Sequence, residues 1–474
     1  MAQPPHDLPA CCLAVPLVMM VHFLGLLLGV TLACAHPSNP IYPAKPLLGP
    51  VVNHTSHGHL YEIDHEGILL KVLHVYGSPA QMGRASGELI GAFAREFVME
   101  AMPPFYAAAL AGGIGPDGDF DASSLPADVQ DQLANASASK DEATMAAAMG
   151  VALDWVFEAE QPFIAASRSQ PLVEMEAYAE GICASFGGCG DDGTLAAAIL
   201  KGVQHVNMVG ELIKMTCTMM GAWGKATPTD VGLVQLRALD VGAAPFANFS
   251  LLTVYHPDEG HAFASLGFPG NVGSVTGWSA QIGVSEKVWE TYERPSVQPG
   301  HYDGEPVTGV IRDMLQFSGS KEEAATFAEG ITRTWAVFLG VGDSSGEFEA
   351  LAYREADLKV YTPGNVTEIT HMPVMEDLVY IDKHPQPSHD NVTMPALMAR
   401  YYGNITAVNT IEATREMATG DLHITVYDFD AKKAYLALGT IDATCSYVAK
   451  ACDRPYLEFD FDDLFDEPLA HSLV

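Results

Sequence analysis

Hydrophobic and polar positions follow two different periods in the two halves of the chain. Before residue 217, apolar residues recur at helical spacing, and Leu89, Phe93 and Phe97 fall on one face. After residue 217 the pattern changes to short apolar runs bounded by turn residues, which is typical of β-strands. Helical patterns cover 79–112, 142–166, 171–185, 305–331 and parts of 393–417. Strand-like runs cover 231–237, 251–255, 262–266, 280–284, 335–339, 348–353, 358–361, 378–381, 423–428 and 434–438. Clustered strands with helices before and after them favour a layered α+β fold over alternating βαβ units.

Both ends of the globular region lack a clear period. Residues 36–62 are rich in Pro and His and are interpreted as an extended, solvated arm. His54, His57 and His59 lie close together in this stretch, but no Cys or Asp completes a metal-ligand set, so we expect no metal site. Residues 458–467 mix Asp with Phe and Leu, and two interpretations stay open: a docked terminus or a disordered one.

The first 35 residues read as a secretory signal. Residues 10–35 are almost wholly apolar and end in Ala33-Cys34-Ala35, the small-x-small pattern read by signal peptidase. The stretch is also long enough for a membrane anchor, which is the less favoured alternative. No later segment is long and apolar enough to span a bilayer. The sequence therefore predicts a secreted or lysosomal protein without a stable membrane span after signal cleavage.

Sequons and charge agree with that compartment. Six asparagines stand two residues before Ser or Thr and are predicted glycosylation sites: Asn53, Asn135, Asn248, Asn365, Asn391 and Asn404. The 59 acidic and 24 basic residues give a net charge of −35, which excludes a general nucleic-acid binder because such proteins neutralise phosphates with Lys and Arg.

Cysteine spacing singles out one thiol. Three of the eight cysteines would leave with the signal, and the sequence-adjacent pairs Cys183/Cys189 and Cys445/Cys452 are predicted disulfides in an oxidising compartment. Four cysteines allow three pairings, so one bridge tying distant parts together remains an alternative. Cys217 is left over, and an odd thiol in a secreted protein is a candidate reactive residue.

The neighbourhood of Cys217 suggests amide chemistry. The thiol is intrinsically nucleophilic once deprotonated, and a new amino terminus at this residue would supply its own base. Arg237 and Asp240, at the end of the next strand-like run, are candidates to orient that amine and hold the site electrostatically. We therefore assign catalytic roles to Cys217, Arg237 and Asp240.

These residues lie in an ordered set of motifs. Cys217-Thr218 is followed by Ala222-Trp-Gly-Lys-Ala-Thr227 and then by Arg237-x-x-Asp240, with Gly77-Ser-Pro-Ala-Gln-Met-Gly83 upstream. The set resembles the amino-terminal-nucleophile (Ntn) cysteine hydrolases, in particular the isopenicillin-N acyltransferase-like group (peptidase C45) and its secreted eukaryotic branch. It is more distantly similar to penicillin V acylase, bile-salt hydrolase and acid ceramidase.

The resemblance implies a four-layer αββα sandwich and an inactive precursor. Autocatalytic cleavage between Thr216 and Cys217 would free the α-amine, leaving a mainly helical part, 36–216, and a strand-rich catalytic part, 217–474, associated as two chains. The substrate would be a small-molecule or lipid amide, cleaved by hydrolysis or acyl transfer through a Cys217 thioester. No metal or organic cofactor is implied.

The oxyanion hole departs from the family pattern. Ser279 stands where more distant relatives carry an Asn, so a hydroxyl or a backbone N–H would have to replace that donor. Trp278 beside it is a candidate substrate contact, although tryptophans more often serve packing. Asn391 is a candidate for a second family Asn, and a glycan there would block it.

Two other readings remain open. Gly342-Asp-Ser-Ser-Gly346 matches the nucleophile elbow of serine hydrolases, with Ser344 as nucleophile, but a strand-like run follows where the elbow needs a helix, so a hairpin turn fits better. A secreted glycoprotein can also keep an enzyme fold as a non-catalytic binding protein, since fold alone does not fix function.

Overall fold

The computed structural model describes residues 39–112, 122, 124–213, 216–242, 245–289, 302–334, 336–366, 373–383, 393–442 and 446–469. The predicted signal segment, Asn391 and Cys445 lie outside these ranges. Within them, no helix combines the length and the apolar character that a membrane crossing requires.

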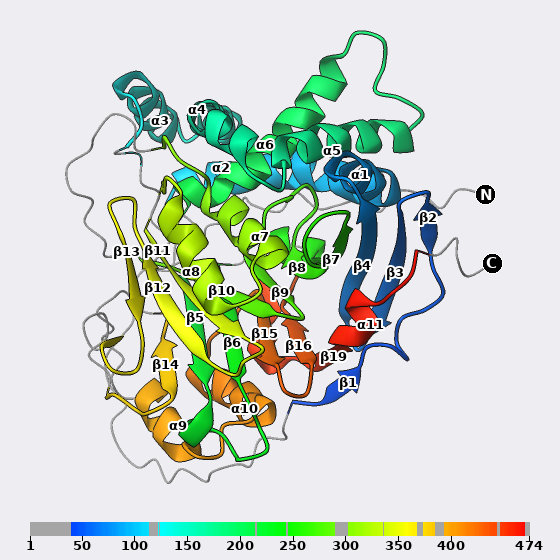
Figure 1. Ribbon diagram of the computed structural model, residues 1–474. Helices are drawn as coiled ribbons and strands as arrows, with labels where there is room; N and C mark the ends of the chain where they lie inside the picture. The colour runs from blue at the N-terminus through cyan, green and yellow to red at the C-terminus, as the bar shows by residue number, and fades with distance from the viewer. Residues whose placement is uncertain are drawn as a thin grey trace, which may run out of the picture.

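Two β-sheets dominate the described part of the chain (Figure 1). The seven-stranded sheet has the spatial order β1 (Ile41–Pro43), β19 (Tyr456–Asp460), β16 (Lys433–Leu438), β15 (His423–Asp428), β6 (Val234–Asp240), β5 (Thr216–Ala222) and β14 (Leu378–Ile381). The ten-stranded sheet has the order β13 (Leu358–Tyr361), β12 (Phe348–Tyr353), β11 (Val337–Asp343), β10 (Ile282–Val288), β9 (Thr276–Ser279), β8 (Phe263–Gly267), β7 (Leu251–Pro257), β4 (Ile68–Gly77), β3 (Gly58–His65) and β2 (Asn53–Thr55). A separate pair joins β17 (Thr440–Ile441) to β18 (Tyr447–Ala449).

Helices cover the outer faces of both sheets, which gives the layer order αββα (Figure 1). The ten-stranded sheet carries the layer containing α1 (Pro79–Glu96), α2 (Met102–Leu110), α3 (Ala127–Ser139), α4 (Glu142–Ala166), α5 (Pro171–Ser185), α6 (Thr194–Leu212), α7 (Val307–Phe317) and α8 (Lys321–Gly330). The seven-stranded sheet carries α9 (Thr393–Tyr401) and α10 (Ala407–Met417), and α11 (Phe461–Phe465) follows β19. Short helical turns are the π-helix η1 (Phe97–Ala101) and the 3-10 turns η2 (Gly224–Ala226), η3 (Pro245–Phe249) and η5 (Ala451–Asp453). The four-layer sandwich predicted from the sequence is confirmed.

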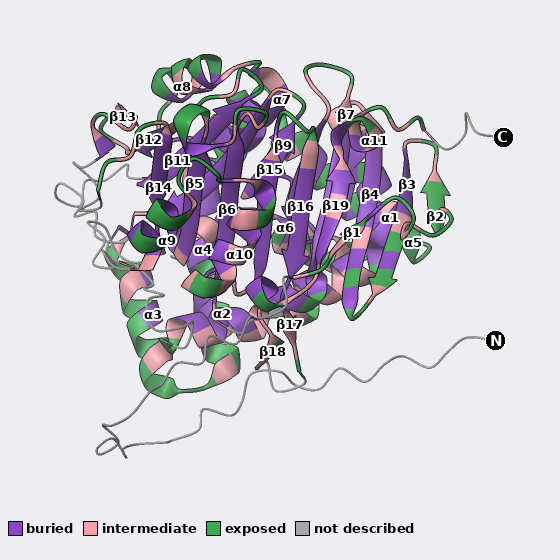
Figure 2. Ribbon diagram, turned by 90° about the horizontal axis from the view of Figure 1, so that it is seen from below, coloured by how far each residue is buried: buried purple, intermediate pink, exposed green. Residues whose placement is uncertain are grey.

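Three apolar layers hold these elements together. One lies between the helices and the ten-stranded sheet, with Val75 and Ile311 in it, and one lies between the sheets, with Val72 and Leu436. The third joins the seven-stranded sheet to α9 and α10. The strands are buried on both faces (Figure 2), which explains why many read as continuous apolar runs rather than as alternating ones.

The segment before the first helix is not a solvated arm, so that interpretation of residues 36–62 was wrong. β1 pairs in parallel with β19, and β2 and β3 extend the ten-stranded sheet beyond β4. β4 in turn runs parallel to β7, which lies after the predicted cleavage point. Residues before 217 therefore supply strands to both sheets as well as the helical layer. The other end is docked, since β19 and α11 belong to the sandwich.

The first helix begins where its sequence predicts. Ser78 caps it: the Ser78 hydroxyl accepts from the Gln81 N–H and the Gln81 side chain accepts from the Ser78 N–H at 2.8 Å, while Pro79 occupies the first turn. The predicted helix over 79–112 is interrupted by η1, which separates α1 from α2.

Glycines let α1 and α5 pack backbone to backbone. A Cβ added to Gly87 would lie 2.2 Å from the Tyr178 carbonyl oxygen, and one added to Gly181 would lie 2.3 Å from the Arg84 carbonyl oxygen. Gly87→Ala is therefore expected to lower the free energy of unfolding by about 1–3 kcal/mol in urea denaturation, because the helices must separate.

Gly150 on α4 is the matched control for that substitution, since a Cβ there meets only one ring atom, of His205, at 3.6 Å. Gly150→Ala is expected to be neutral or stabilising by up to about 1 kcal/mol through helix propensity. Equal effects of the two substitutions would contradict the close packing of α1 on α5.

Candidate active site

Cys217 is the second residue of β5, an inner strand of the seven-stranded sheet. It pairs in register with Leu239 of β6, and its side chain is fully buried. The thiol faces the other sheet, where its Sγ lies 3.7 Å from Oε2 of Glu286 on β10. The thiol therefore sits between the two sheets, at the start of a rigid strand.

Arg237 lies beside this thiol and links the sheets. Its buried guanidinium donates to Glu286 Oε2 at 3.2 Å, to the Ala238 carbonyl at 2.8 Å and to the Val275 carbonyl at 3.4 Å. Burial raises the pKa of Cys217 to about 12, and the Arg237 charge opposes that shift. Burial also raises the pKa of Glu286, and the Arg237 charge again opposes that shift. The structure thus brings together Cys217 and Arg237 as predicted.

Asp240 points to the opposite face of the same sheet. Arg237 and Asp240 are three residues apart on β6, and side chains alternate along a strand. The Asp240 carboxylate accepts from the Thr419 hydroxyl at 2.6 Å and the Gly420 N–H at 2.9 Å, with Lys383 Nζ at 3.7 Å. In register, however, Asp240 pairs with Thr216, so it lies beside the strand end at which the predicted cleavage would occur.

Three further polar residues lie near the thiol and were missed by sequence reasoning. Glu286 and Lys287 follow each other on β10, and both are buried. His423 on β15 pairs with Leu239, so Cys217, Leu239 and His423 form one row across three strands. Two adjacent charged residues, Glu286 and Lys287, in an otherwise apolar strand could have indicated a functional site. They were missed because the strand predicted from the sequence ended at Val284.

His423 also bonds across the two sheets. Its Nε2 lies 2.9 Å from the Thr276 hydroxyl, and burial, assisted by the Arg237 charge, lowers its pKa well below the ordinary value. The imidazole is therefore a neutral group near the guanidinium, and it extends the polar layer between the sheets from the thiol to β15.

The predicted oxyanion residues lie away from Cys217. Ser279 caps the β9–β10 turn, where its hydroxyl accepts from the Gln281 and Ile282 N–H groups at 3.2 and 3.1 Å. That turn is the opposite end of β9 from Thr276, roughly 10 Å along the strand. Ser279 therefore caps this turn in the uncut chain, and its oxyanion role stays a prediction. Trp278 is fully buried 5.3 Å from the Tyr427 ring, as a packing residue between the sheets, and Asn391 lies outside the described residues.

Ser344 does not form a nucleophile elbow. It sits in the turn that joins β11 to β12, antiparallel neighbours in the ten-stranded sheet, and its N–H donates to the Gln281 carbonyl at 2.8 Å. A strand follows the turn where the elbow requires a helix. The hairpin interpretation is confirmed and the serine-hydrolase alternative is removed.

The described cysteines pair in part as predicted. Cys183 and Cys189 form a disulfide with a Cα–Cα distance of 5.0 Å. Cys452 is a buried free cysteine, and its predicted partner Cys445 lies outside the described residues, so that second pairing is not confirmed.

The predicted glycosylation sites differ in exposure. Asn53, Asn135, Asn248 and Asn404 are exposed. Asn365 is half-buried, and its amide is engaged with the Thr362 N–H at 2.7 Å and the Val360 carbonyl at 3.1 Å. Four of the five sequon asparagines that the structure describes are thus open to modification as they stand.

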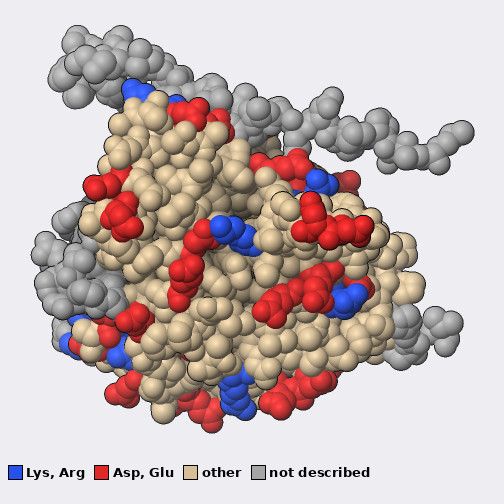
Figure 3. Space-filling model, turned by 90° about the horizontal axis from the view of Figure 1, so that it is seen from above, with Lys and Arg blue, Asp and Glu red and all other residues tan. Residues whose placement is uncertain are grey.

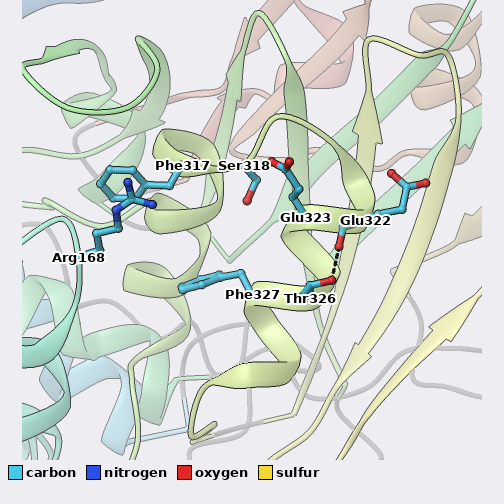
Figure 4. A pocket seen from close by; sticks show the side chains of 7 residues that line it. All are labelled: Arg168, Phe317, Ser318, Glu322, Glu323, Thr326 and Phe327. Carbon is cyan, nitrogen blue, oxygen red and sulfur yellow. Dashed lines mark hydrogen bonds between the residues drawn. The ribbon is translucent and has the colours of Figure 1, made fainter.

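Neither of two cavities in the described residues is lined by Cys217. No group of three or more His, Cys, Asp or Glu side chains in the described ranges is placed to hold a metal ion. A cavity of about 440 Å³ lies between Arg168, Phe317 and Phe327, with Arg168 stacked 3.8 Å from the Phe317 ring centre (Figure 4). A second cavity of about 510 Å³ lies under α11. Cys217 lines neither of them.

Comparisons with known proteins give two relatives in sequence. No family model matches the chain. Protein dcd1A of Dictyostelium discoideum is 28% identical over 475 residues, which cover 95% of this chain and 99% of that protein. Protein dcd1B of the same organism is 30% identical over 446 residues, which cover 90% of this chain and 81% of that protein.

Solved structures give only weak likenesses. An N-acylethanolamine-hydrolyzing acid amidase ortholog of Caenorhabditis elegans has a TM-score of 0.36 and 14% identity, covering 45% of this chain and 93% of that one. A C2A mutant of the conjugated bile acid hydrolase of Clostridium perfringens has a TM-score of 0.31 and 11% identity, covering 53% and 94%. Likenesses at this level bear neither on the fold nor on the site. The sequence matches show that the chain belongs to the family of the Dictyostelium proteins dcd1A and dcd1B.

Proposed function

We propose that this protein is an Ntn-type cysteine amidohydrolase or acyltransferase that matures by cutting itself between Thr216 and Cys217. The observation that carries the proposal is the buried cluster at the start of β5, where Oε2 of Glu286 lies 3.7 Å from the Cys217 thiol and accepts a hydrogen bond of 3.2 Å from the Arg237 guanidinium. A nucleophile, a cation and a proton acceptor on two rigid sheets are the parts that acyl transfer to sulfur requires.

Maturation would proceed by an acyl shift at the Thr216–Cys217 bond. Sγ attacks the Thr216 carbonyl carbon and passes its proton to Glu286, the nearest carboxylate. The carbon–nitrogen bond then breaks as the Cys217 nitrogen takes up a proton, which leaves Thr216 joined to sulfur as a thioester. Water cleaves that thioester, releasing the Thr216 carboxylate and restoring the thiol.

The mature enzyme would repeat this chemistry on an external amide. The freed α-amine of Cys217, with a pKa near ~8, serves as the base. Arg237 stabilises the thiolate, and Asp240 lies in register with the position that Thr216 vacates, where it can bond the new amine. The acyl group passes to Cys217 and then to water or to an acceptor amine, without a cofactor.

Both parts of the cut chain would stay together. β4, from the part before Cys217, is paired along its length with β7 from the part after it. The side chain of Asn207 on α6 accepts from the Val272 and Gly273 N–H groups and donates to the Gly270 carbonyl at 2.8 Å. Such an interface is continuous with the core, so separation would require unfolding.

A secreted or lysosomal location is part of the same proposal. Four exposed sequons and the Cys183–Cys189 disulfide support passage through an oxidising, glycosylating compartment. The face shown in Figure 3 carries more acidic than basic groups, as expected for a highly solvated acidic surface.

The alternative of a non-catalytic binding protein has one observation in its favour. Cys217 is fully buried, so its thiol is not exposed to a substrate in the uncut chain. Maturation must open the site if the proposal is right.

A trapping experiment tests the activity. Secreted protein with a Cys217 amino terminus is expected to release amine from a panel of N-acyl amides with short, long and aromatic acyl groups. Acid quenching followed by mass spectrometry should then find the acyl mass on the peptide that begins at Cys217. Iodoacetamide at that residue should abolish turnover, whereas turnover that persists with a fully alkylated Cys217 would rule out this nucleophile.

A further inference from the structure

The ten-stranded sheet extends beyond the seven-stranded one at its β4–β3–β2 edge. There the inner face is covered by α11 and the residues that follow it, which lie beside β3 and β4 in Figure 1. We call residues 461–467 the C-terminal cap. Five ring side chains of β3, β4 and β7 meet it: His59, Tyr61, His74, Tyr76 and His256.

The three histidines form a continuous stack. His59 and His74 rings lie 5.1 Å apart at 11°, and His74 and His256 rings lie 5.4 Å apart at 19°. Tyr76 lies flat on His256 at 4.2 Å and 5°. Strand register produces this order, because His59 pairs with His74 and Tyr76 pairs with His256.

The cap is anchored to the rings on either side of the stack. Tyr61 donates to the Glu467 carboxylate and Tyr76 donates to the Glu467 backbone carbonyl, both at 2.8 Å. His59 Nε2 lies 3.8 Å from the same carboxylate. Glu467 thus spans the stack from one tyrosine to the other, so a displacement of the rings displaces the cap.

The hydrogen bond inside the stack requires that at least one of the two bonded rings is neutral. His74 Nδ1 and His256 Nε2 lie 3.1 Å apart, so one nitrogen donates and the other accepts. A proton on the accepting nitrogen would place two N–H groups against each other. Protons on neighbouring rings would also place like charges about 5 Å apart in a buried layer, which is strongly unfavourable.

We propose that this histidine stack is an acid-operated latch: neutral rings hold the C-terminal cap on the sheet, and proton uptake by the stack releases it. The device is independent of the chemistry at Cys217. It fits a protein that passes from a neutral to an acidic compartment.

Titration behaviour agrees with this geometry. Burial, and then the neighbouring histidines, lower the pKa of His59 and of His256 from 6.5 to about 4, and lower that of His74 well below 6.5. A histidine whose pKa is lowered in the docked state favours docking fully at pH values above 6.5. It loses that contribution as the pH falls from 6.5 toward 4. At pH 5, His59 and His256 would each shift the equilibrium toward release by roughly 30-fold, if exposure restores a pKa of 6.5.

Charged and titratable groups from several packed elements surround the stack. They are His54 on β2, Tyr61 on β3, Tyr76 on β4, Glu467 in the cap, and Lys45, Glu458, Asp460 and Asp463 around the adjoining cavity. Among the residues that the structure describes, Glu467 is the acid within ion-pair distance of the stack, and it can compensate a single protonated His59 but not three charged rings.

Protons have a route to the stack. The cavity of about 510 Å³ under α11 is lined by His74 and Tyr61 and by acidic residues of β19 and the cap. His74 therefore borders a space large enough for water, and its protonation does not require prior unfolding.

Hydrogen–deuterium exchange of the full-length protein tests the latch. Exchange of residues 456–469 is followed at pH 7.5 and pH 4.5, with times corrected for the intrinsic rate at each pH. We expect protection of this segment to fall at least 10-fold at pH 4.5, with a midpoint between pH 6.5 and 4, while β5 and β6 keep theirs.

Variants separate the histidines from the acids nearby. The triple variant His59→Phe/His74→Phe/His256→Phe keeps flat rings that take no proton, and it should retain its cap protection at pH 4.5. His256→Phe alone, which preserves stacking on Tyr76, should lower the midpoint if the triple variant does not fold. His205→Phe on α6, outside the stack and its neighbours, should release its cap at the same pH as the wild type. An unchanged cap at pH 4.5 in the wild type, or the same release in the His256→Phe variant, would overturn the proposal.

Discussion

Cys217→Ala is expected to leave the protein as one uncut chain, whereas the wild type separates into two fragments, the second beginning at Cys217. Without the sulfur no acyl shift can start at the Thr216 carbonyl, so the rate of cleavage should fall by roughly 10⁴-fold or more. The measurement is denaturing gel electrophoresis with mass spectrometry of secreted protein, after glycan removal and disulfide reduction. A fragment mass that starts at Cys217 identifies the cleaved bond.

Cys452→Ala is the matched control for that substitution. Like Cys217, Cys452 is a buried free cysteine, but it has no role in the proposed reaction. The Cys452→Ala variant should therefore be cut like the wild type. Cleavage that persists in Cys217→Ala would point to an external protease. A wild type that stays whole at both neutral and acidic pH would favour the non-catalytic glycoprotein instead.

The same comparison separates maturation from catalysis. Arg237 and Glu286 contact each other and the thiol region before any cut is made, so the intact chain already holds the parts for the acyl shift. Asp240 is engaged with the 419–420 turn and becomes relevant only when Thr216 leaves the strand end beside it. Processing should therefore depend strongly on Glu286 and turnover of an external amide on Asp240.

Local patterns were enough to predict most elements of the fold. The 142–166 and 171–185 helices coincide with α4 and α5 because their apolar periodicity and end residues are local signals. The prediction of a solvated arm for residues 36–62 was wrong because the structure of this segment depends on distant partners. The three-residue β1 exists through pairing with β19 more than 400 residues away, and His59 is buried by ring stacking, which no local pattern reports.

The sequence predicted only those residues of the candidate site that lie in the same sheet as Cys217. Cys217 and Arg237 lie on neighbouring strands, so spacing along the chain brings them close. Glu286 comes from the opposite sheet, and only the stacking of the two layers places it 3.7 Å from the thiol. Ser279 was assigned by its position in a family motif, yet its hydroxyl is needed by the β9–β10 turn.

Arg312→Leu is expected to lower the free energy of unfolding by about 3–5 kcal/mol. Arg312 on α7 and Glu174 on α5 form an ion pair of 2.7 Å, and both side chains are almost completely buried. The guanidinium also lies 4.6 Å over the Tyr255 ring. Burial raises the pKa of Glu174 and the Arg312 charge opposes that shift, so removing the cation leaves a buried carboxylate without its counter-charge.

Urea denaturation in the Cys217→Ala background measures this loss without interference from cleavage. The double variant Glu174→Met/Arg312→Leu should recover most of the stability, because no charge is then left alone in the apolar layer. Arg400→Leu is the surface control: its 2.7 Å pair with Glu416 is about half exposed, and its loss should cost less than about 1 kcal/mol. If Arg312→Leu costs no more than Arg400→Leu, the α5–α7 contact is solvated rather than buried. Because Glu174 and Arg312 lie on opposite sides of the predicted cut, the same substitution should also make the two mature chains separate at lower urea concentration than in the wild type.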